Sequence, residues 1–148
     1  MRNKIISINK LKELKEKFNL KKIGLVHGVF DLFHYGHLLH LEKAKSLCDI
    51  LVVSITADKF ISKGPGRPFY NNSQRKKMIA SLSQVNYVVL SEQKSAVEII
   101  NSLKPNFYFK GNDYANFKND YSKKIIKEVN AVKKNNGKII FTNEKTFS

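Results

Sequence analysis

Cysteine, proline, glycine and long apolar runs are all scarce in this chain of 148 residues. The single cysteine, Cys48, cannot form a disulfide within the chain, which is typical of a reducing compartment, and we expect a cytoplasmic protein. Three prolines and seven glycines, beside 42% hydrophobic residues, exclude collagen-like and disordered chains. No apolar run approaches the roughly 20 residues of a membrane-spanning helix, and the first residues lack the apolar stretch of a secretory signal.

Acidic residues are also few: 12 of them stand against 27 lysines and arginines, which gives a formal net charge of +15. A charge of this sign suits a nucleic acid or another anionic partner. Only Arg2, Arg67 and Arg75 are arginines, however, and the lysines are scattered without aromatic residues between them. We interpret them as a solvated surface that is compatible with a small anionic substrate, and we expect neither a specific nucleic acid nor a membrane as partner.

Short apolar runs alternate with segments of helical periodicity along the chain. The apolar runs predict five strands, at 23–27, 50–55, 85–89, 106–110 and 138–142. The periodic segments predict helices at 8–19, 35–47, 73–82, 95–103 and 120–134, and a long surface loop is expected at 112–124. This alternation is typical of an α/β fold, a Rossmann-like three-layer sandwich with a parallel sheet between helices. We expect a single domain over residues 1–148, with residues 1–20 as an N-terminal helical extension.

The segment GVFDLFHYGH, residues 28–37, joins the first predicted strand to the next helix. In α/β folds, ligands bind at the carboxyl ends of strands, and the first turn of a helix attracts phosphate. His34 and His37 are three residues apart, so a helical turn puts both imidazoles on one face, and Gly36 between them lets a phosphate approach the backbone. Two imidazoles aimed at one point can stabilise a phosphoryl group in a transition state, and phosphoryl transfer requires mainly positioning and such stabilisation.

A histidine pair at this spacing is also compatible with a metal site or with two surface residues. A metal site needs a third ligand, and the candidates do not fit: Cys48 and His40 lie on the wrong stretch, and His27 precedes the turn. We therefore assign no metal to protein side chains. The full arrangement of strand, Gly-x-Phe-Asp, His-x-Gly-His and helix is far more specific than the histidine pair alone.

Residues 28–37 resemble the signature of the cytidylyltransferase-like nucleotidylyltransferases. The small glycerol-3-phosphate cytidylyltransferases are similar through the histidine motif and Arg75, but they carry a lysine cluster where this chain has residues 64–67. The resemblance extends over residues 8–142 and implies the strand order 3-2-1-4-5. It is strongest to heptose-1-phosphate adenylyltransferase domains, in which similar segments follow in the same order: Gly66-Arg67-Pro68, Arg75, Val85–Val89, Leu103–Pro105 and Lys110–Tyr114.

What the resemblance implies is a nucleotidylyltransferase. AMP or CMP would pass from ATP or CTP, bound with Mg²⁺, to a sugar or polyol phosphate, with release of pyrophosphate. The product would be a nucleotide-activated sugar for cell-surface polysaccharide, and a homodimer is compatible with this resemblance. His34 and His37 would be catalytic, and the nucleotide would be bound by Gly28, Val29, Phe30, Gly36, Lys110, Gly111 and Asp113.

Three basic residues are candidates for the phosphate and substrate site: Lys63, Arg67 and Arg75. Lys63 and Arg67 lie in a loop rich in glycine and proline, where functional groups often reside, but ordinary exposed charges would fit there as well. Arg75, in the first turn of a helix, has a structural ion pair as its alternative. Lys110 at a strand end has a plain surface lysine as its alternative, and we expect Asp31 to orient the turn by accepting backbone N–H bonds.

The chain departs from the family pattern at two places. Asn86 stands where members usually have an aspartate, and the chain stops at residues 145–148, where a Ser/Thr-rich turn that binds the triphosphate would begin. Either the sequence is one domain of a longer chain, or part of the nucleotide clamp is missing. The rival hypothesis is therefore a catalytically silent nucleotide-binding or regulatory domain.

Overall fold

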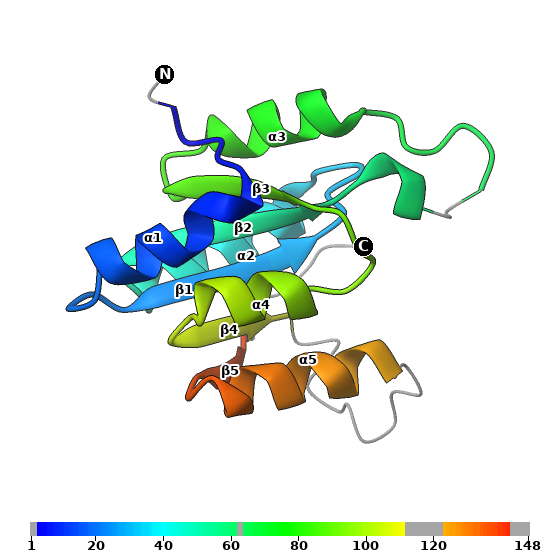
Figure 1. Cartoon of the computed structure of the whole chain (residues 1–148). Helices are drawn as coiled ribbons and strands as arrows, with labels where there is room; N and C mark the ends of the chain where they lie inside the picture. Colours follow the sequence, from blue (N-terminus) through cyan, green and yellow to red (C-terminus); the bar gives the residue numbers. More distant parts are fainter. Residues whose placement is uncertain (1–2, 62–63, 112–122, 143–148) are drawn as a thin grey trace.

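The computed structural model describes residues 3–61, 64–111 and 123–142. Their helices and strands alternate along the chain (Figure 1). The strands are β1 (Ile23–Gly28), β2 (Ile50–Thr56), β3 (Tyr87–Ser91), β4 (Phe107–Lys110) and β5 (Lys138–Phe141). The helices are α1 (Leu11–Lys17), α2 (Tyr35–Ser46), α3 (Asn72–Ala80), α4 (Val97–Leu103) and α5 (Lys123–Lys134), with short 3-10 turns η1 (Ile8–Lys10) and η2 (Asp58–Phe60).

The five strands form one parallel sheet in the order β3-β2-β1-β4-β5, which confirms the predicted fold class and strand order. β1 is the central strand: Leu25 pairs with Val52 of β2 on one side and with Tyr108 of β4 on the other. The central strands of such a sheet are covered on both faces, which explains their nearly continuous apolar runs.

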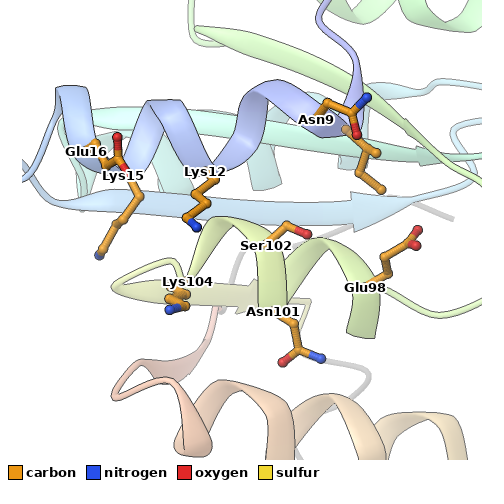
Figure 2. Close-up of a pocket in the computed structure, with 9 residues that line it drawn as sticks. Asn9, Lys12, Lys15, Glu16, Glu98, Asn101, Ser102 and Lys104 are labelled. Atoms are coloured by element: carbon orange, nitrogen blue, oxygen red, sulfur yellow. The ribbon is translucent and has the colours of Figure 1, made fainter.

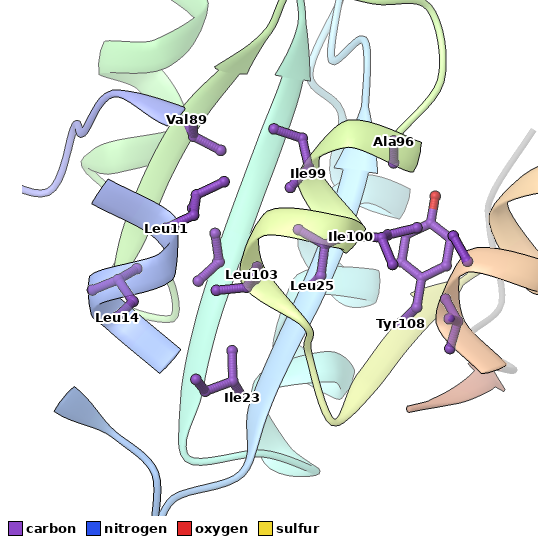
Figure 3. Close-up of a cluster of buried hydrophobic side chains, with 13 residues drawn as sticks. Leu11, Leu14, Ile23, Leu25, Val89, Ala96, Ile99, Ile100, Leu103 and Tyr108 are labelled. Carbon is purple, nitrogen blue, oxygen red and sulfur yellow. The ribbon is translucent and has the colours of Figure 1, made fainter. Parts of the chain in front are cut away.

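Consecutive residues of β1 pack on opposite faces of the sheet, as the pleat of a strand requires. Leu25 belongs to a buried cluster with α1, α4 and α5, which includes Leu11 and Ile100 (Figure 3). Val26 belongs to a second cluster on the other face, where α2 and α3 contribute side chains such as Leu41. Helices therefore close both faces of the sheet and form the expected three layers.

The strand order reverses at the centre of the sheet. The connection from β1 through α2 leads to β2, whereas the connection from β3 through α4 returns to β4 on the other side of β1. In open α/β sheets, ligands bind beyond the carboxyl ends of the strands at such a reversal. The fold therefore favours a ligand site at the carboxyl ends of β1 and β4.

Most element boundaries lie within two residues of the sequence-based expectation, as for α3 at 72–80 instead of 73–82 and α4 at 97–103 instead of 95–103. β3 begins at Tyr87, two residues later than predicted, because the Val85 N–H still bonds within the turn that follows α3. The predicted extension over residues 1–20 is helical over 8–17 in the described part, and the residues just before it run beside β3, where they bond to the backbone of Val88.

The predicted loop at 112–124 lies outside the described residues, except for its last two, which begin α5. Within the described ranges, no helix is both long enough and apolar enough to cross a membrane. Asn86, which replaces the usual aspartate, accepts hydrogen bonds at 2.8 Å from the Leu51 N–H and from Nζ of Lys45. A neutral amide oxygen therefore joins α2 to β2 at this position.

Candidate active site

The loop after β1 leads into the N-terminus of α2, and two histidines cap that terminus. His34 is the N-cap residue: its Nδ1 accepts a hydrogen bond from the Gly36 N–H at 3.0 Å. In return, the His34 N–H donates to Nδ1 of His37 at 3.1 Å. This reciprocal arrangement is a capping box built from two imidazoles, and it satisfies N–H groups that the first helical turn would otherwise leave unbonded.

The capping bonds determine which ring nitrogen of each histidine carries the proton. A nitrogen that accepts a hydrogen bond carries no proton, so the N–H of each neutral ring is at Nε2. The rings of His34 and His37 stack with centroids 3.8 Å apart and planes 21° apart. Two Nε2–H donors therefore lie close together at the positive end of α2, which suits a phosphoryl group.

Aromatic side chains from the preceding loop hold the ring of His37. The Phe33 ring stacks on it at 5.6 Å between centroids, and the Phe30 ring meets it edge-on at 5.2 Å. Phe30 is buried, and a Cβ atom at Gly28 would lie 2.9 Å from its ring, so glycine leaves the space that this ring needs. Because the Phe30 ring already packs against His37, residues 28–30 would contact a nucleotide through their backbone groups.

Asp31 ties the histidine turn to the loop that follows β2. Its buried carboxylate accepts backbone N–H bonds, but the donors are Phe69 and Tyr70 of the distant loop and not the histidine turn itself, and Nε of Arg67 also donates to it at 2.9 Å. Burial raises the pKa of Asp31, but these hydrogen bonds and the arginine charge outweigh it, so the pKa lies below its usual value. Arg67 also donates to the Asp31 carbonyl and lies over the Phe69 ring, so it stands beside the histidine turn with its side chain 23% exposed.

Arg75 has no exposed surface. Its guanidinium donates to oxygens at the carboxyl ends of β1 and β2 and around the start of α3: the carbonyls of Val29, Thr56 and Tyr70 and the side chains of Asp58 and Asn72. This geometry favours the ion-pair alternative for Arg75 over a direct phosphate contact. The arginine instead fixes the loops that surround the histidine turn.

Lys110 ends β4 at the strand reversal, on the face of the sheet opposite α2. Its side chain is 8% exposed, and Nζ lies 3.3 Å from Oε1 of Glu128 on α5, so it is not a plain surface lysine. The same carboxylate accepts hydrogen bonds from the Tyr108 hydroxyl at 2.7 Å and from the Ala96 N–H at 2.8 Å. On the neighbouring strand β1, Nδ1 of His27 lies 2.7 Å from the Ser54 hydroxyl.

Sequence reasoning missed Glu128, although a signal for it is present. Ile125, Val129 and Val132 are buried residues of α5, and Glu128 shares their side of the helix by spacing. A carboxylate among buried apolar residues requires a buried partner. Lys110, which ends the strand that precedes α5 along the chain, is the natural candidate.

Two of the predicted site residues, Lys63 and Asp113, lie outside the described residues. Gly111 follows β4 directly and is half-buried. In the ranges that the structure does describe, no three His, Cys, Asp or Glu side chains gather as metal ligands would.

A groove of about 540 Å³ between α1 and α4 contains none of the predicted site residues (Figure 2). It is lined by polar and charged side chains beside a single isoleucine: Ile8, Asn9, Lys12, Lys15, Glu16, Glu98, Asn101, Ser102 and Lys104. The histidine motif contributes nothing to its walls, so we do not place the chemistry there.

The sequence matches known proteins over most of its length. The model of the cytidylyltransferase-like family matches residues 25–147. The Bifunctional protein HldE of Helicobacter pylori (strain G27) is 43% identical over 115 residues, which are 76% of this chain and 25% of that protein. HldE of Aliarcobacter butzleri is 38% identical over 120 residues, again 25% of its length. The chain thus spans about a quarter of the length of the curated relatives that it matches.

Solved structures share the fold at lower sequence identity. A lipopolysaccharide core biosynthesis protein from Thermoplasma volcanium superposes with a TM-score of 0.65 and 21% identity, over 86% of this chain and 99% of that one. A pantoate-beta-alanine ligase from Francisella tularensis gives a TM-score of 0.60, also at 21% identity, over 97% and 67% of the two chains. The family match and the curated relatives confirm the resemblance seen in the histidine motif: the chain belongs to the cytidylyltransferase-like family of nucleotidyltransferases.

Proposed function

We propose that this domain transfers AMP or CMP from a nucleoside triphosphate to a sugar or polyol phosphate. The observation that carries this proposal is the pair of stacked imidazoles at the start of α2, which offer Nε2–H donors while Nδ1 is held by the backbone. A positively polarised helix terminus with two such donors matches the charge of a phosphoryl group.

The reaction joins one phosphate to another. An oxygen of the sugar phosphate attacks the α-phosphorus of the nucleotide, the bond from that phosphorus to the bridging oxygen breaks, and pyrophosphate leaves with the electron pair. His34 and His37 donate hydrogen bonds to the non-bridging oxygens of the α-phosphate, where charge grows in the transition state. No nucleophilic side chain is required.

The basic residues have different roles in this proposal. Arg67 is partly exposed beside the histidine turn and would contact a phosphate once a ligand competes with Asp31 for its guanidinium. Arg75 acts indirectly: its hydrogen bonds to the carbonyls of Val29 and Tyr70 fix the segments that follow β1 and precede α3. Lys63 keeps its expected phosphate role.

Lys110, Gly111 and Asp113 would bind the base and ribose beyond the end of β4. The resemblance to heptose-1-phosphate adenylyltransferase domains favours ATP over CTP and a heptose-like phosphate as acceptor. The HldE relatives support that resemblance.

Mg²⁺ would accompany the triphosphate. His34 and His37 offer nitrogen rather than oxygen, and the Asp31 carboxylate already accepts hydrogen bonds from Arg67 and the backbone. Hard Mg²⁺ prefers oxygen ligands, so the phosphates and water would supply them. The ion would neutralise part of the phosphate charge.

A pyrophosphate-release screen tests the proposal: the four nucleoside triphosphates are each combined with a panel of sugar and polyol phosphates, with and without Mg²⁺. We expect release that requires both substrates. Nucleotide binding by calorimetry without turnover on any acceptor would instead support the catalytically silent domain.

A further inference from the structure

We propose that Glu128 of α5 is a positioning residue for nucleotide binding, and that its buried carboxylate keeps the ammonium group of Lys110 charged and fixed at the carboxyl end of β4. The inference rests on the proposed function, because it takes Lys110 as a nucleotide-binding residue. Glu128 itself would not touch the substrate.

Hydrogen bonds from two elements fix the Glu128 carboxylate before any ligand arrives. Glu128 is fully buried, and its Oε1 accepts from the Tyr108 hydroxyl of β4, while Oε2 accepts from the Ala96 N–H at the start of α4. Nζ of Lys110 lies 3.3 Å from Oε1 and 5.0 Å from the centre of the Tyr108 ring. The carboxylate therefore has a defined position, and the ammonium group is held against it.

The pair is also coupled through charge. Burial disfavours the charged form of both groups, so a buried lysine without a carboxylate loses its proton at a lower pH. Among the described residues, Glu128 from α5 and Tyr108 from its own strand contact Lys110, and His27 from β1 acts on the charge of Glu128. Burial raises the pKa of Glu128, but Lys110 and the two hydrogen bonds outweigh it and lower the pKa overall.

The place of the pair in the fold indicates a role beyond stability. A buried ion pair can often be replaced by apolar residues without loss of stability, so packing alone does not require one. This pair lies where the strand order reverses, next to the end of β1 that carries the histidine turn. A lysine held charged at that edge would present its N–H donors to the base and ribose and add a positive charge beside the anionic nucleotide, from the face of the sheet opposite α2.

Glu128→Gln tests this inference, with Tyr108→Phe as the matched control. Glutamine keeps the size and one acceptor oxygen but removes the charge, whereas Tyr108→Phe removes a hydrogen bond to the same carboxylate and keeps the charge. ATP and CTP binding are measured by calorimetry from pH 7.5 to 9.5. For Glu128→Gln we expect affinity to fall as the pH rises, by up to about tenfold per pH unit above the lowered lysine pKa.

The control separates positioning from a purely structural role. We expect both variants to melt at a lower temperature, but Tyr108→Phe should keep the flat pH profile of the wild type. Nζ resonances of ¹⁵N-lysine, assigned with Lys110→Met, give a readout without nucleotide: Lys110 should titrate at a lower pH in Glu128→Gln. If Glu128→Gln does not fold, Glu128→Asp replaces it, and we expect weaker binding with a flat pH profile.

The outcomes distinguish the two proposals. If the wild type binds neither ATP nor CTP, the proposed function fails and this assignment fails with it. If the wild type binds nucleotide, and Glu128→Gln leaves both its affinity at every pH and the Lys110 titration unchanged, the proposed function stands and the assignment of Glu128 is overturned. If Glu128→Asp has to be used, nucleotide affinity equal to that of the wild type likewise overturns the assignment of Glu128.

Discussion

The imidazoles of His34 and His37 have two roles that use different ring nitrogens. Nδ1 of each ring accepts a backbone N–H and caps α2, whereas Nε2 carries the proton that the proposed chemistry uses. A substitution to alanine removes both roles at once. Side chains that keep an acceptor near the Nδ1 position can separate helix capping from catalysis.

His34→Asn and His37→Gln should therefore lower turnover without unfolding the protein. Asparagine is a favourable N-cap residue, so we expect the unfolding free energy of His34→Asn to lie within about 0.5 kcal/mol of the wild type. Glutamine is a usual N3 residue of a capping box, but His37→Gln also loses the ring contacts with Phe30 and Phe33, so we expect a cost of about 1 kcal/mol. Loss of one transition-state donor should lower turnover about 100- to 1000-fold, with a smaller effect on nucleotide affinity. Melting temperature and pyrophosphate release measure the two effects; a destabilised but normally active variant would refute the catalytic role.

For comparison, His37→Ala should lose the donor and the cap together. The lost hydrogen bond from the His34 N–H costs about 1 kcal/mol of unfolding free energy, and the loss of packing against Phe30 and Phe33 adds to it. Its turnover should match that of His37→Gln once both are expressed per folded molecule.

Asp31 predicts a pH dependence of stability. Its pKa in the folded protein lies below its usual value, so its interactions stabilise the fold above the unfolded pKa and are lost as the pH falls through the folded pKa. Asp31→Asn should lower the unfolding free energy by about 1–3 kcal/mol at pH 7. Denaturation from pH 7 to pH 3 should show this difference shrinking below about pH 4; a difference that stays constant with pH would contradict the argument.

At the scale of whole elements, Arg75 joins the ends of β1 and β2 to the start of α3. Arg75→Met leaves the buried carbonyls and Asp58 without their cation, and we expect a loss of about 3–5 kcal/mol in unfolding free energy. Lys77→Met, which removes an exposed cation from the same helix, is the control and should change stability by less than about 0.5 kcal/mol. If Arg75→Met kept the stability of the wild type but bound triphosphate more weakly, Arg75 would have to contact the phosphates directly, and the structural role would be refuted.

For the whole molecule, the net charge of +15 predicts non-specific attraction to polyanions. Binding to duplex and single-stranded DNA should weaken steeply with salt, by about 10³-fold or more between 50 and 200 mM if six phosphates are contacted. Fluorescence polarisation with unrelated DNA sequences measures this dependence. Submicromolar, sequence-dependent affinity at physiological salt would contradict our expectation that the chain has no specific nucleic acid partner.

The element pattern and the histidine motif were predictable because both depend on residues close in sequence. Continuous apolar runs predicted the buried strands, and the spacing of His34 and His37 across Gly36 predicted their shared face. The strand order was predicted through the resemblance alone, since apolar runs do not say which strands are neighbours. The boundary of β3 was missed because a turn bond after α3 competes with the strand for Val85.

The sequence by itself therefore determined the fold class and the shared face of His34 and His37, and the tertiary structure decided which charges are available beside them. Arg75 and Lys110 are both cations at strand or helix ends, yet one is buried among carbonyls and the other is paired with Glu128, 18 residues further along the chain. Asp31 and Arg67 meet across 36 residues. Such partners are set by the packing of distant elements, and the burial of each charge, which fixes its energy, exists only once the chain has folded.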